Sequence, residues 1–305
     1  MLNFNQSCIL LNKPSGISSN DALKKVKKKL NQKKAGFSGT LDPLASGLLI
    51  IFFNKATKLC SMFLNADKSY DVLIRIGEAS TTGDLDGEIT CDNFFTDIKN
   101  IDLKKIEKKF MGTIKQTPPM YSALKHNGKR LYEYARKGLE IDRPSRLVTI
   151  HSIKLKVFDE NHLSLNVKCS KGTYIRVLAE QIGKEIGCGA LVAKLVRTKI
   201  NDIELSKTVK LDNFLLSSDE EIYNKYIINI DLLIENIPSC HISENDTKKI
   251  LHGNKVGINK KACKVVKIYN SDNIFMGIGE INKNLELLPK KNISVKLNVC
   301  MINIT

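Results

Sequence analysis

The sequence lacks a membrane-spanning segment, a signal-peptide pattern and tryptophan. No apolar run approaches the roughly 20 residues that a membrane-spanning helix needs, so the chain is not expected to cross a bilayer. Residues 1–6 contain no basic residue and no signal-peptide pattern, which favours a cytoplasmic protein. Tryptophan is absent, and Lys, Asn and Ile are abundant. This compositional bias carries no information about mechanism.

Cysteine is present, but not in the patterns that carry cysteine chemistry. None of the eight residues forms a C-x-x-C pair, which argues against both a zinc site and a dense disulfide framework. We therefore expect no metal, and we expect the thiols to be reduced and partly buried, as in the cytosol. The residues are Cys8, Cys60, Cys91, Cys169, Cys188, Cys240, Cys263 and Cys300.

The abundant feature is positive charge. Lys and Arg number 48 against 32 Asp and Glu, which gives a formal net charge of +16 and a pI of about 9.4. Such an excess attracts polyanions, so a nucleic acid or an anionic membrane surface is the natural partner. At 305 residues, the chain can bury a substantial core and can hold more than one domain.

One stretch places a single carboxylate on a stiff loop. Asp42 lies between Gly39 and Gly47, two residues that permit tight turns or the close approach of another backbone. Pro43 biases Asp42 away from the helical region. The apolar run 48–53 follows, long enough for a strand buried on both faces. Local physics alone favours a turn-forming Asp-Pro pair over a catalytic loop.

Two segments combine basic residues with regularly placed apolar or aromatic residues. In residues 20–30, apolar residues share one helical face and lysines crowd the rest, which indicates either phosphate contact or a solvated surface. Residues 116–136 interleave aromatic with basic side chains, which suits stacking on bases beside phosphate contacts. For Tyr132 and Tyr134, taken singly, local packing is the more common role.

The remaining periodic patterns predict strands with one long helix. Period-two alternation predicts a strand over 70–76 and a hairpin over 147–169, and a helical face predicts a helix over 175–186. The D-x-D-G spacing of residues 84–87 resembles a calcium loop, but no further acidic ligand completes it, so we interpret it as a hairpin turn. Short helices are expected in 209–236.

After about residue 238 the pattern changes to short strands separated by turns, which predicts a small β domain. The expected strands are 264–269, 274–281, 285–288 and 293–299.

Motif blocks in order across residues 8–200 resemble the TruB family of tRNA pseudouridine synthases. Residues 39–47 match the family's catalytic pattern G-x-L-D-P-x-A-x-G, and residues 13–18 match its K-P-x-G-x-S block. K-x-Y-x-V at 68–72 and K-G-T-Y-I-R at 171–176 match further blocks, and 189–198 match a last one loosely. Near the C-terminus, two short segments resemble a PUA-type RNA-binding barrel.

The resemblance implies an α+β fold, with a central mixed, mainly antiparallel sheet flanked by helices and a small C-terminal PUA-like β-barrel. The implied catalytic domain is 1–236, with an RNA-gripping insertion at about 113–146. The implied PUA-like RNA-binding domain is 237–305.

The implied activity is isomerisation of uridine to pseudouridine at position 55, in the T-loop of tRNA, on a flipped-out uridine. Asp42 would be the nucleophile, attacking either the sugar or the base, and both routes stay open. Arg176 would hold its charge, since a close arginine lowers a carboxyl pKa by roughly 1–3 units. Tyr70 would stack on the base and act as acid or base, although without the resemblance it would be interpreted as a core residue. No redox step occurs, so no cofactor is expected.

The resemblance also implies a set of substrate-binding residues. Tyr174 is expected to pack against the Asp42–Arg176 pair, and Leu195 against the flipped base. The other members are Phe37, Lys13, Lys58 and Lys171. Phe37 departs from the family, which commonly has histidine five residues before the catalytic aspartate. A phenyl ring can still stack there, but it cannot form the hydrogen bonds of histidine.

The expected partner is the T-arm of tRNA, bound by a monomer with no obligatory protein partner and no membrane. Two alternatives stay open. The chain could be a guide-RNA-dependent relative, against which residues 118–121 and the bacterial-like length argue. It could also be an RNA-binding module or folding chaperone without catalysis, against which the intact set of Asp42, Tyr70 and Arg176 argues.

Overall fold

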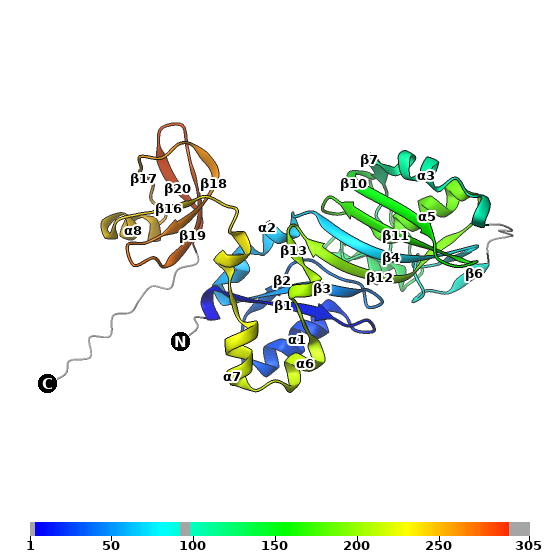
Figure 1. Cartoon of the computed structure of the whole chain (residues 1–305), viewed down its shortest axis with the longest axis horizontal. Coiled ribbons are helices and arrows are strands. Elements are labelled where there is room, and N and C mark those ends of the chain that lie inside the picture. The colour runs from blue at the N-terminus through cyan, green and yellow to red at the C-terminus, as the bar shows by residue number, and fades with distance from the viewer. Residues whose placement is uncertain (1–3, 92–97, 293–305) are drawn as a thin grey trace.

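The computed structural model describes residues 4–91 and 98–292 (Figure 1). Most strands of this part form one eleven-stranded sheet, whose main path has the order β14-β1-β3-β12-β4-β11-β10-β7. Among the described strands of this sheet, only the β1–β14 and β3–β12 pairs are parallel, which confirms the expected mixed, mainly antiparallel sheet. Its strands are β1 (Ser7–Lys13), β2 (Ala35–Phe37), β3 (Ser46–Phe53), β4 (Lys68–Ile76), β7 (Gly112–Gln116), β10 (Arg146–Val157), β11 (His162–Cys169), β12 (Ala190–Ile200), β13 (Ile203–Glu204), β14 (Val209–Lys210) and β15 (Ile228–Asn229).

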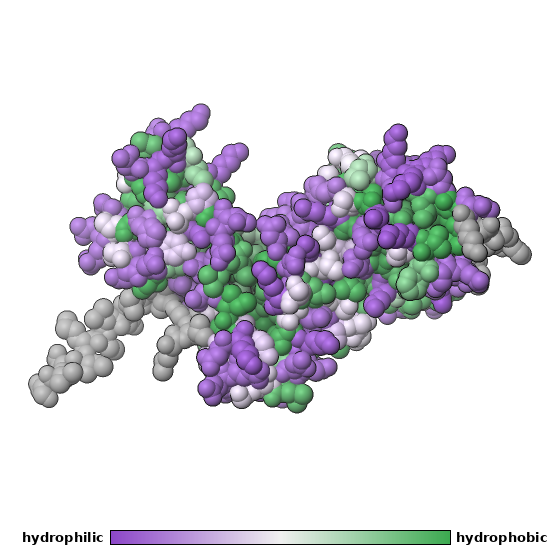
Figure 2. Space-filling model, viewed as in Figure 1, coloured by the Kyte–Doolittle hydropathy of each residue, from purple (hydrophilic) through white to green (hydrophobic). Residues whose placement is uncertain are grey.

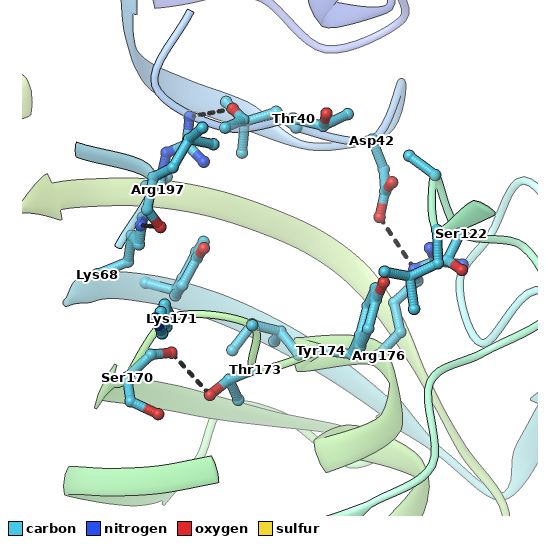
Figure 3. A pocket seen from close by; sticks show the side chains of 18 of the residues that line it. Thr40, Asp42, Lys68, Ser122, Ser170, Lys171, Thr173, Tyr174, Arg176 and Arg197 are labelled. Atoms are coloured by element: carbon cyan, nitrogen blue, oxygen red, sulfur yellow. Dashed lines mark hydrogen bonds and ion pairs between the residues drawn. The ribbon is translucent and has the colours of Figure 1, made fainter. Parts of the chain in front are cut away.

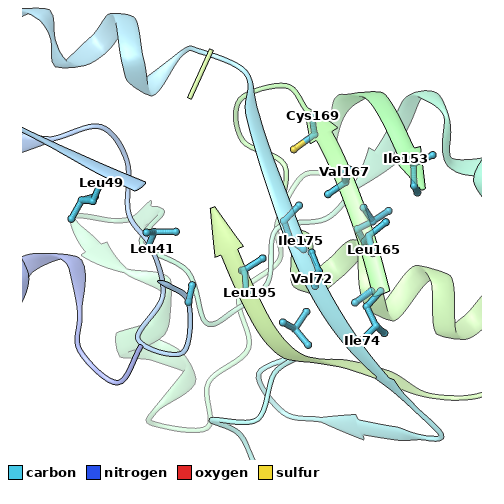
Figure 4. Packing of buried hydrophobic residues seen from close by; sticks show 14 of the residues in the cluster. Leu41, Leu49, Val72, Ile74, Ile153, Leu165, Val167, Cys169, Ile175 and Leu195 are labelled. Carbon is cyan, nitrogen blue, oxygen red and sulfur yellow. The ribbon is translucent and has the colours of Figure 1, made fainter. Parts of the chain in front are cut away.

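The strand after the Asp42 loop is buried on both faces, as its apolar sequence predicts. Because successive side chains of a strand point to opposite faces, β3 contributes side chains to two hydrophobic clusters. Leu49, Ile51 and Phe53 belong to the larger cluster, and Leu48, Ile50 and Phe52 to a second cluster. The larger cluster continues across β4, β11 and β12, where apolar side chains from separate strands meet (Figure 4).

Four helices cover the face of the sheet that carries the larger cluster, since each contributes buried apolar side chains to it. They are α1 (Ser19–Lys29), α3 (Leu103–Phe110), α5 (Ile175–Ile186) and α6 (Leu211–Leu216). Helix α1 begins after Ser18, whose side chain accepts a hydrogen bond from the Asp21 amide. Helix α5 ends at Gly187, whose φ of 92° is the left-handed conformation that glycine adopts most easily. Both helices confirm the sequence prediction.

The C-terminal strands form a separate five-stranded sheet, with the order β16-β18-β19-β20-β17 and one helix, α8 (Glu244–Leu251). It confirms the predicted small β domain, and its half-barrel sheet is consistent with a PUA-like module. The expected strand 293–299 lies outside the described residues. The strands are β16 (Ser239–His241), β17 (Val256–Gly257), β18 (Cys263–Tyr269), β19 (Phe275–Ile281) and β20 (Glu286–Asn292).

The two sheets pack against each other through the second hydrophobic cluster. Phe275 and Ile278 of β19 are buried there with residues of β1 and β3, on the face opposite the four helices. The Tyr269 hydroxyl also donates a hydrogen bond to Asp231, at 3.0 Å. Apolar surface gathers at this junction (Figure 2). The predicted domain boundary at 236–237 falls between η6 (Ile230–Ile234) and β16.

The predicted insertion begins inside the main sheet, because β7 pairs with β10. Beyond β7 it contains the hairpin β8 (Lys125–His126) and β9 (Lys129–Arg130), then α4 (Leu131–Ala135). Both tyrosines have local partners. The guanidinium carbons of Arg130 and Arg136 lie 5.9 and 5.4 Å from the centroid of the Tyr132 ring. The Tyr134 hydroxyl donates a hydrogen bond to a backbone carbonyl.

The remaining predicted elements are also present. The D-x-D-G segment is the turn of a hairpin between β5 (Glu78–Ser80) and β6 (Ile89–Cys91). Short helices occur in the linking segment, among them α7 (Asp219–Glu221). In the described part of the chain, no helix is long and apolar enough to cross a membrane, and no cluster of His, Cys, Asp and Glu is arranged to hold a metal ion.

Candidate active site

A cavity of about 680 Å³ opens between the Asp42 loop, β4, β12 and the start of α5 (Figure 3). The fold brings six of the nine predicted site residues into its wall, although they are distributed over more than 150 positions of the sequence. These six are Asp42, Tyr70, Lys171, Tyr174, Arg176 and Leu195. The other three, Phe37, Lys13 and Lys58, do not line it.

The Asp42 loop is held by buried contacts on both sides. Leu41 is buried, its N–H donates to the Ser19 hydroxyl at 2.8 Å, and the same hydroxyl donates back to the Leu41 carbonyl at 2.9 Å. On the other side, Gly47 has φ +107° and lies so close to β12 that a Cβ there would come within 2.4 Å of the Arg197 carbonyl oxygen. The carboxylate is therefore mounted on a loop with little freedom to move.

Arg176 pairs with Asp42, as the motif resemblance implied. Its Nε lies 3.0 Å from Asp42 Oδ2, and the arginine side chain is 5% exposed. Its Nη atoms donate to the carbonyls of Thr82 and Tyr121, at 2.6 and 2.8 Å. Because the guanidinium contacts groups from three separate segments, it fixes the geometry of this wall of the cavity.

Asp84 is a second carboxylate beside the same guanidinium, and no sequence motif marks it as a site residue. Its Oδ2 lies 3.5 Å from Arg176 Nε, and its side chain is 4% exposed. The surrounding D-x-D-G pattern correctly predicts a turn. Nothing in that pattern indicates contact with an arginine 92 positions later in the chain.

The net effect on Asp42 is a raised pKa. Burial raises the pKa of this carboxyl, Arg176 lowers it, and the carboxylates of Asp84 and Asp86 raise it again. We expected Arg176 to offset the cost of burial, but its charge is shared between two carboxylates and burial dominates. The side chain of Asp42 is 39% exposed. The result is an accessible carboxylate that is more basic than an ordinary aspartate.

Tyr70 and Arg197 face each other across neighbouring strands, since β4 and β12 pair in the register that sets them opposite. Burial raises the pKa of Tyr70 to about 12, although Arg197 acts in the opposite direction. The hydroxyl is therefore protonated at neutral pH and can donate a hydrogen bond. Arg197 is 2% exposed and donates to the carbonyls of Leu48 and Gly39, at 2.8 and 3.0 Å.

Arg197 belongs to the last, loosely matched motif block, whose sequence alone does not indicate a role for it. Its contacts with Gly39 and Leu48 join β12 to both ends of the Asp42 loop. We therefore assign it a positioning role.

Cationic and aromatic groups line the cavity. The Arg146 guanidinium lies over the Tyr174 ring, with its carbon 4.8 Å from the ring centroid, a cation–π contact. Lys171 is exposed and donates to the Asn65 side chain at 3.0 Å. Lys68 is buried, its ammonium donates to three backbone carbonyls, and burial lowers its pKa to about 8. This surplus of positive charge suits an anionic ligand.

The geometry of Lys13 favours a different role from the predicted substrate contact. Its side chain is fully buried, and its ammonium donates to the carbonyls of Pro14, Ile17 and Pro43, at 2.8, 2.7 and 3.4 Å. Because Pro43 follows Asp42 directly, we infer that Lys13 positions the loop. Burial lowers its pKa to about 8.

The other two residues outside the cavity keep their predicted roles as hypotheses. Phe37 is partly buried on β2 and packs against the larger hydrophobic cluster. Lys58 is exposed on η2 (Asn54–Leu59).

Comparison with known proteins gives consistent similarities along the chain. The family model described as TruB family pseudouridylate synthase (N terminal domain) matches residues 27–175, and the one described as Pseudouridine synthase II TruB, C-terminal, matches residues 238–293. The chain is 40% identical over 288 residues to tRNA pseudouridine synthase B of Azoarcus sp. (strain BH72), covering 94% of this chain and 95% of that protein. It is 41% identical over 284 residues to the protein of that name from Methylobacillus flagellatus, covering 93% of each.

Solved structures support the fold. The structure titled Crystal Structure of a Cbf5-Nop10-Gar1 Complex superimposes with a TM-score of 0.71 at 24% identity, covering 95% of this chain and 86% of that one. The archaeal box H/ACA sRNP Nop10-Cbf5 complex gives 0.68 at 21% identity, covering 95% and 87%. At these identities, the likeness concerns the fold alone.

Proposed function

Because the chain belongs to the TruB family of pseudouridylate synthases, we propose that it isomerises uridine to pseudouridine at position 55 of tRNA, in the T-loop, with Asp42 as the nucleophile. The observation that carries the proposal is the Asp42–Arg176 pair, at 3.0 Å, in the wall of a cavity lined by cationic groups. The cavity volume of about 680 Å³ is sufficient for one nucleotide.

The reaction breaks the bond between uracil N1 and the sugar C1′ and joins C1′ to C5 of the same ring. The proton on C5 is lost and N1 gains one, so the change is an isomerisation without an oxidant or reductant. Asp42 attacks either C1′ or the ring and holds one fragment while the base turns. The raised pKa of Asp42 suits this role, because a more basic carboxylate is a better nucleophile once ionised.

Other residues of the cavity have supporting roles in the proposal. The target uridine must leave its stack, which costs a few kcal/mol, and phosphate contacts at Lys171 and Arg146 offset that cost. The Tyr70 ring stacks on the extruded base, and its protonated hydroxyl is available as a donor. Leu195 covers the other side of the base, and Tyr174 packs beside the Asp42–Arg176 pair.

The decisive variant is Asp42→Asn, which keeps the shape of the side chain and removes the nucleophile. On a T-arm stem-loop RNA, we expect pseudouridine formation to fall by about 10³-fold or more while RNA binding stays within a few-fold of wild type. Asp212→Asn, on the exposed face of α6, is the matched control and should keep full activity. Undiminished pseudouridine formation by Asp42→Asn would overturn the proposal.

We also propose that the enzyme acts alone, as a cytoplasmic monomer. Residues 1–236 would carry catalysis and 237–305 would bind RNA, with 113–146 gripping the substrate. The alternative is a guide-RNA-dependent enzyme, because a structural relative was solved as a complex with Nop10 and Gar1. Pseudouridine formed on naked tRNA by the purified chain would exclude that alternative, and light scattering on the same sample would test the monomer.

A further inference from the structure

Ser122 lines the cavity, and its side-chain hydroxyl is buried without a hydrogen-bond partner among the described residues. The residue is 5% exposed. Buried polar side-chain atoms are nearly always hydrogen-bonded in native proteins, so an orphan in a cavity wall needs an explanation. Two other cavity hydroxyls are engaged: Ser170 accepts from the Thr149 amide at 2.9 Å, and Thr173 donates to the Ser170 carbonyl at 2.9 Å.

The position of Ser122 is fixed by its backbone. Its amide donates to the Met120 carbonyl at 2.8 Å, and its carbonyl accepts from the Tyr132 amide at 3.2 Å. The preceding residue, Tyr121, accepts from Arg176 through its carbonyl at 2.8 Å. Ser122 consequently lies beside the Asp42–Arg176 pair (Figure 3). The unpartnered hydroxyl therefore belongs to a residue whose backbone is fixed next to the arginine that pairs with the proposed nucleophile.

We propose that the Ser122 hydroxyl hydrogen-bonds an oxygen of the target nucleotide when the nucleotide occupies the cavity. Ser122 is then a substrate-contacting residue of the reaction, and this inference rests on the proposed function. A flipped uridine brings both uracil carbonyl oxygens and a ribose 2′-hydroxyl into the cavity, and a serine hydroxyl can pair with either kind of group. Through this contact, the insertion that contains Ser122 would bind the same nucleotide that Asp42 attacks.

The test compares Ser122→Ala with wild type on a T-arm stem-loop RNA, measuring kcat, KM and the thermal unfolding midpoint. We expect kcat/KM to fall about 3- to 10-fold, the usual effect of one neutral hydrogen bond. The unfolding midpoint of the free protein should be unchanged or higher, because the hydroxyl has no protein partner to lose. Ser217→Ala is the control: that serine is also buried, lies outside the cavity and donates to the Asn213 carbonyl at 2.9 Å.

Binding of RNA with 2′-deoxyuridine at the target position identifies the partner oxygen. It is measured in an Asp42→Asn background, so that no turnover intervenes. If the penalty for Ser122→Ala disappears with this RNA, the partner is the ribose hydroxyl; if it persists, the partner is a uracil oxygen. Either result supports the inference.

Two outcomes separate this inference from the proposed function. Wild-type kcat/KM and affinity in Ser122→Ala would overturn the inference while leaving the proposed function intact. An inactive wild-type protein in the same assay would overturn the proposed function, and the inference with it. Should Ser122→Ala fail to fold, Ser122→Cys replaces it. A folded cysteine variant with wild-type kinetics and affinity would overturn the inference, because a thiol is only a weak donor.

Discussion

Asp84 Oδ2 lies 3.5 Å from Arg176 Nε, the same atom that lies 3.0 Å from Asp42 Oδ2. One buried guanidinium thus serves two carboxylates, one buried with it and one open to the cavity. The buried partner compensates for the burial of the arginine. It also repels negative charge on Asp42, which is one reason why the pKa of Asp42 is raised.

Asp84→Asn should therefore lower the pKa of Asp42. If Asp42 must be ionised to react, the acid limb of the kcat/KM profile will move to lower pH, because one source of negative charge is gone. Turnover at neutral pH should fall about 10-fold, since Arg176 loses one of its anchors. A pH–rate profile between about pH 4 and pH 8 on the T-arm RNA measures both effects. An acid limb at the wild-type position would contradict the assigned coupling.

Asp42→Asn should stabilise the free protein at neutral pH. Because the pKa of Asp42 is raised in the folded state, its ionised form is less favourable there than in the unfolded chain. Stability is therefore lost as pH rises from the ordinary aspartate pKa through the folded-state pKa. We expect the variant to melt roughly 1–5 °C above wild type at neutral pH, with the difference shrinking toward about pH 4. A lower melting point at neutral pH would show that the Arg176 contact outweighs burial.

Tyr70→Phe should separate stacking from hydrogen bonding. The ring remains, and Arg197 keeps its contacts with the Leu48 and Gly39 carbonyls. We expect RNA affinity within about 3-fold of wild type and a loss of about 10²-fold or more in kcat. Because the pKa of Tyr70 is about 12, the wild-type profile should show no basic limb from this residue near neutral pH. Tyr70→Ala, which removes the ring as well, should also weaken binding.

Lys171→Ala should weaken RNA binding without a large change in kcat. Lys171 is exposed and lines the cavity, where a phosphate contact would release a counterion. The slope of log affinity against log salt should fall in magnitude by about 0.7–0.9. Lys225→Ala, exposed and paired with Glu221 away from the cavity, is the matched control. An unchanged slope in Lys171→Ala would exclude the contact.

Gly47→Ala should disrupt the loop and its connection to β12. The added methyl would meet the Arg197 carbonyl oxygen at 2.4 Å, and the φ of +107° is strained for any L-residue with a side chain. We expect a loss of about 2–4 kcal/mol in the free energy of unfolding and a large fall in kcat. Gly138→Ala is the control for φ alone, because nothing lies within 4 Å of its Cβ position although its φ is also positive. Equal losses in both variants would show that close approach is unimportant.

The sequence by itself determined the main helices and strands and the residues expected to carry the chemistry. The uninterrupted apolar run after Asp42 predicted a strand buried on both faces, and the structure divides it between two clusters. The apolar helical face of residues 175–186 predicted α5. These features are local, because periodicity and backbone preference depend on neighbours in the chain. Motif order then indicated Asp42, Tyr70 and Arg176.

Only the tertiary structure decided which side chains meet. Asp84 reaches Arg176 from a turn whose sequence shows no link to α5, and Arg197 faces Tyr70 because β4 pairs with β12 in one register. Lys13 was predicted at the substrate, but its ammonium is enclosed by backbone carbonyls. The sequence likewise gives no sign that the buried Ser122 hydroxyl lacks a hydrogen-bond partner. Burial and charge pairing depend on contacts between distant segments, and those contacts set the pKa values on which the chemistry of Asp42 depends.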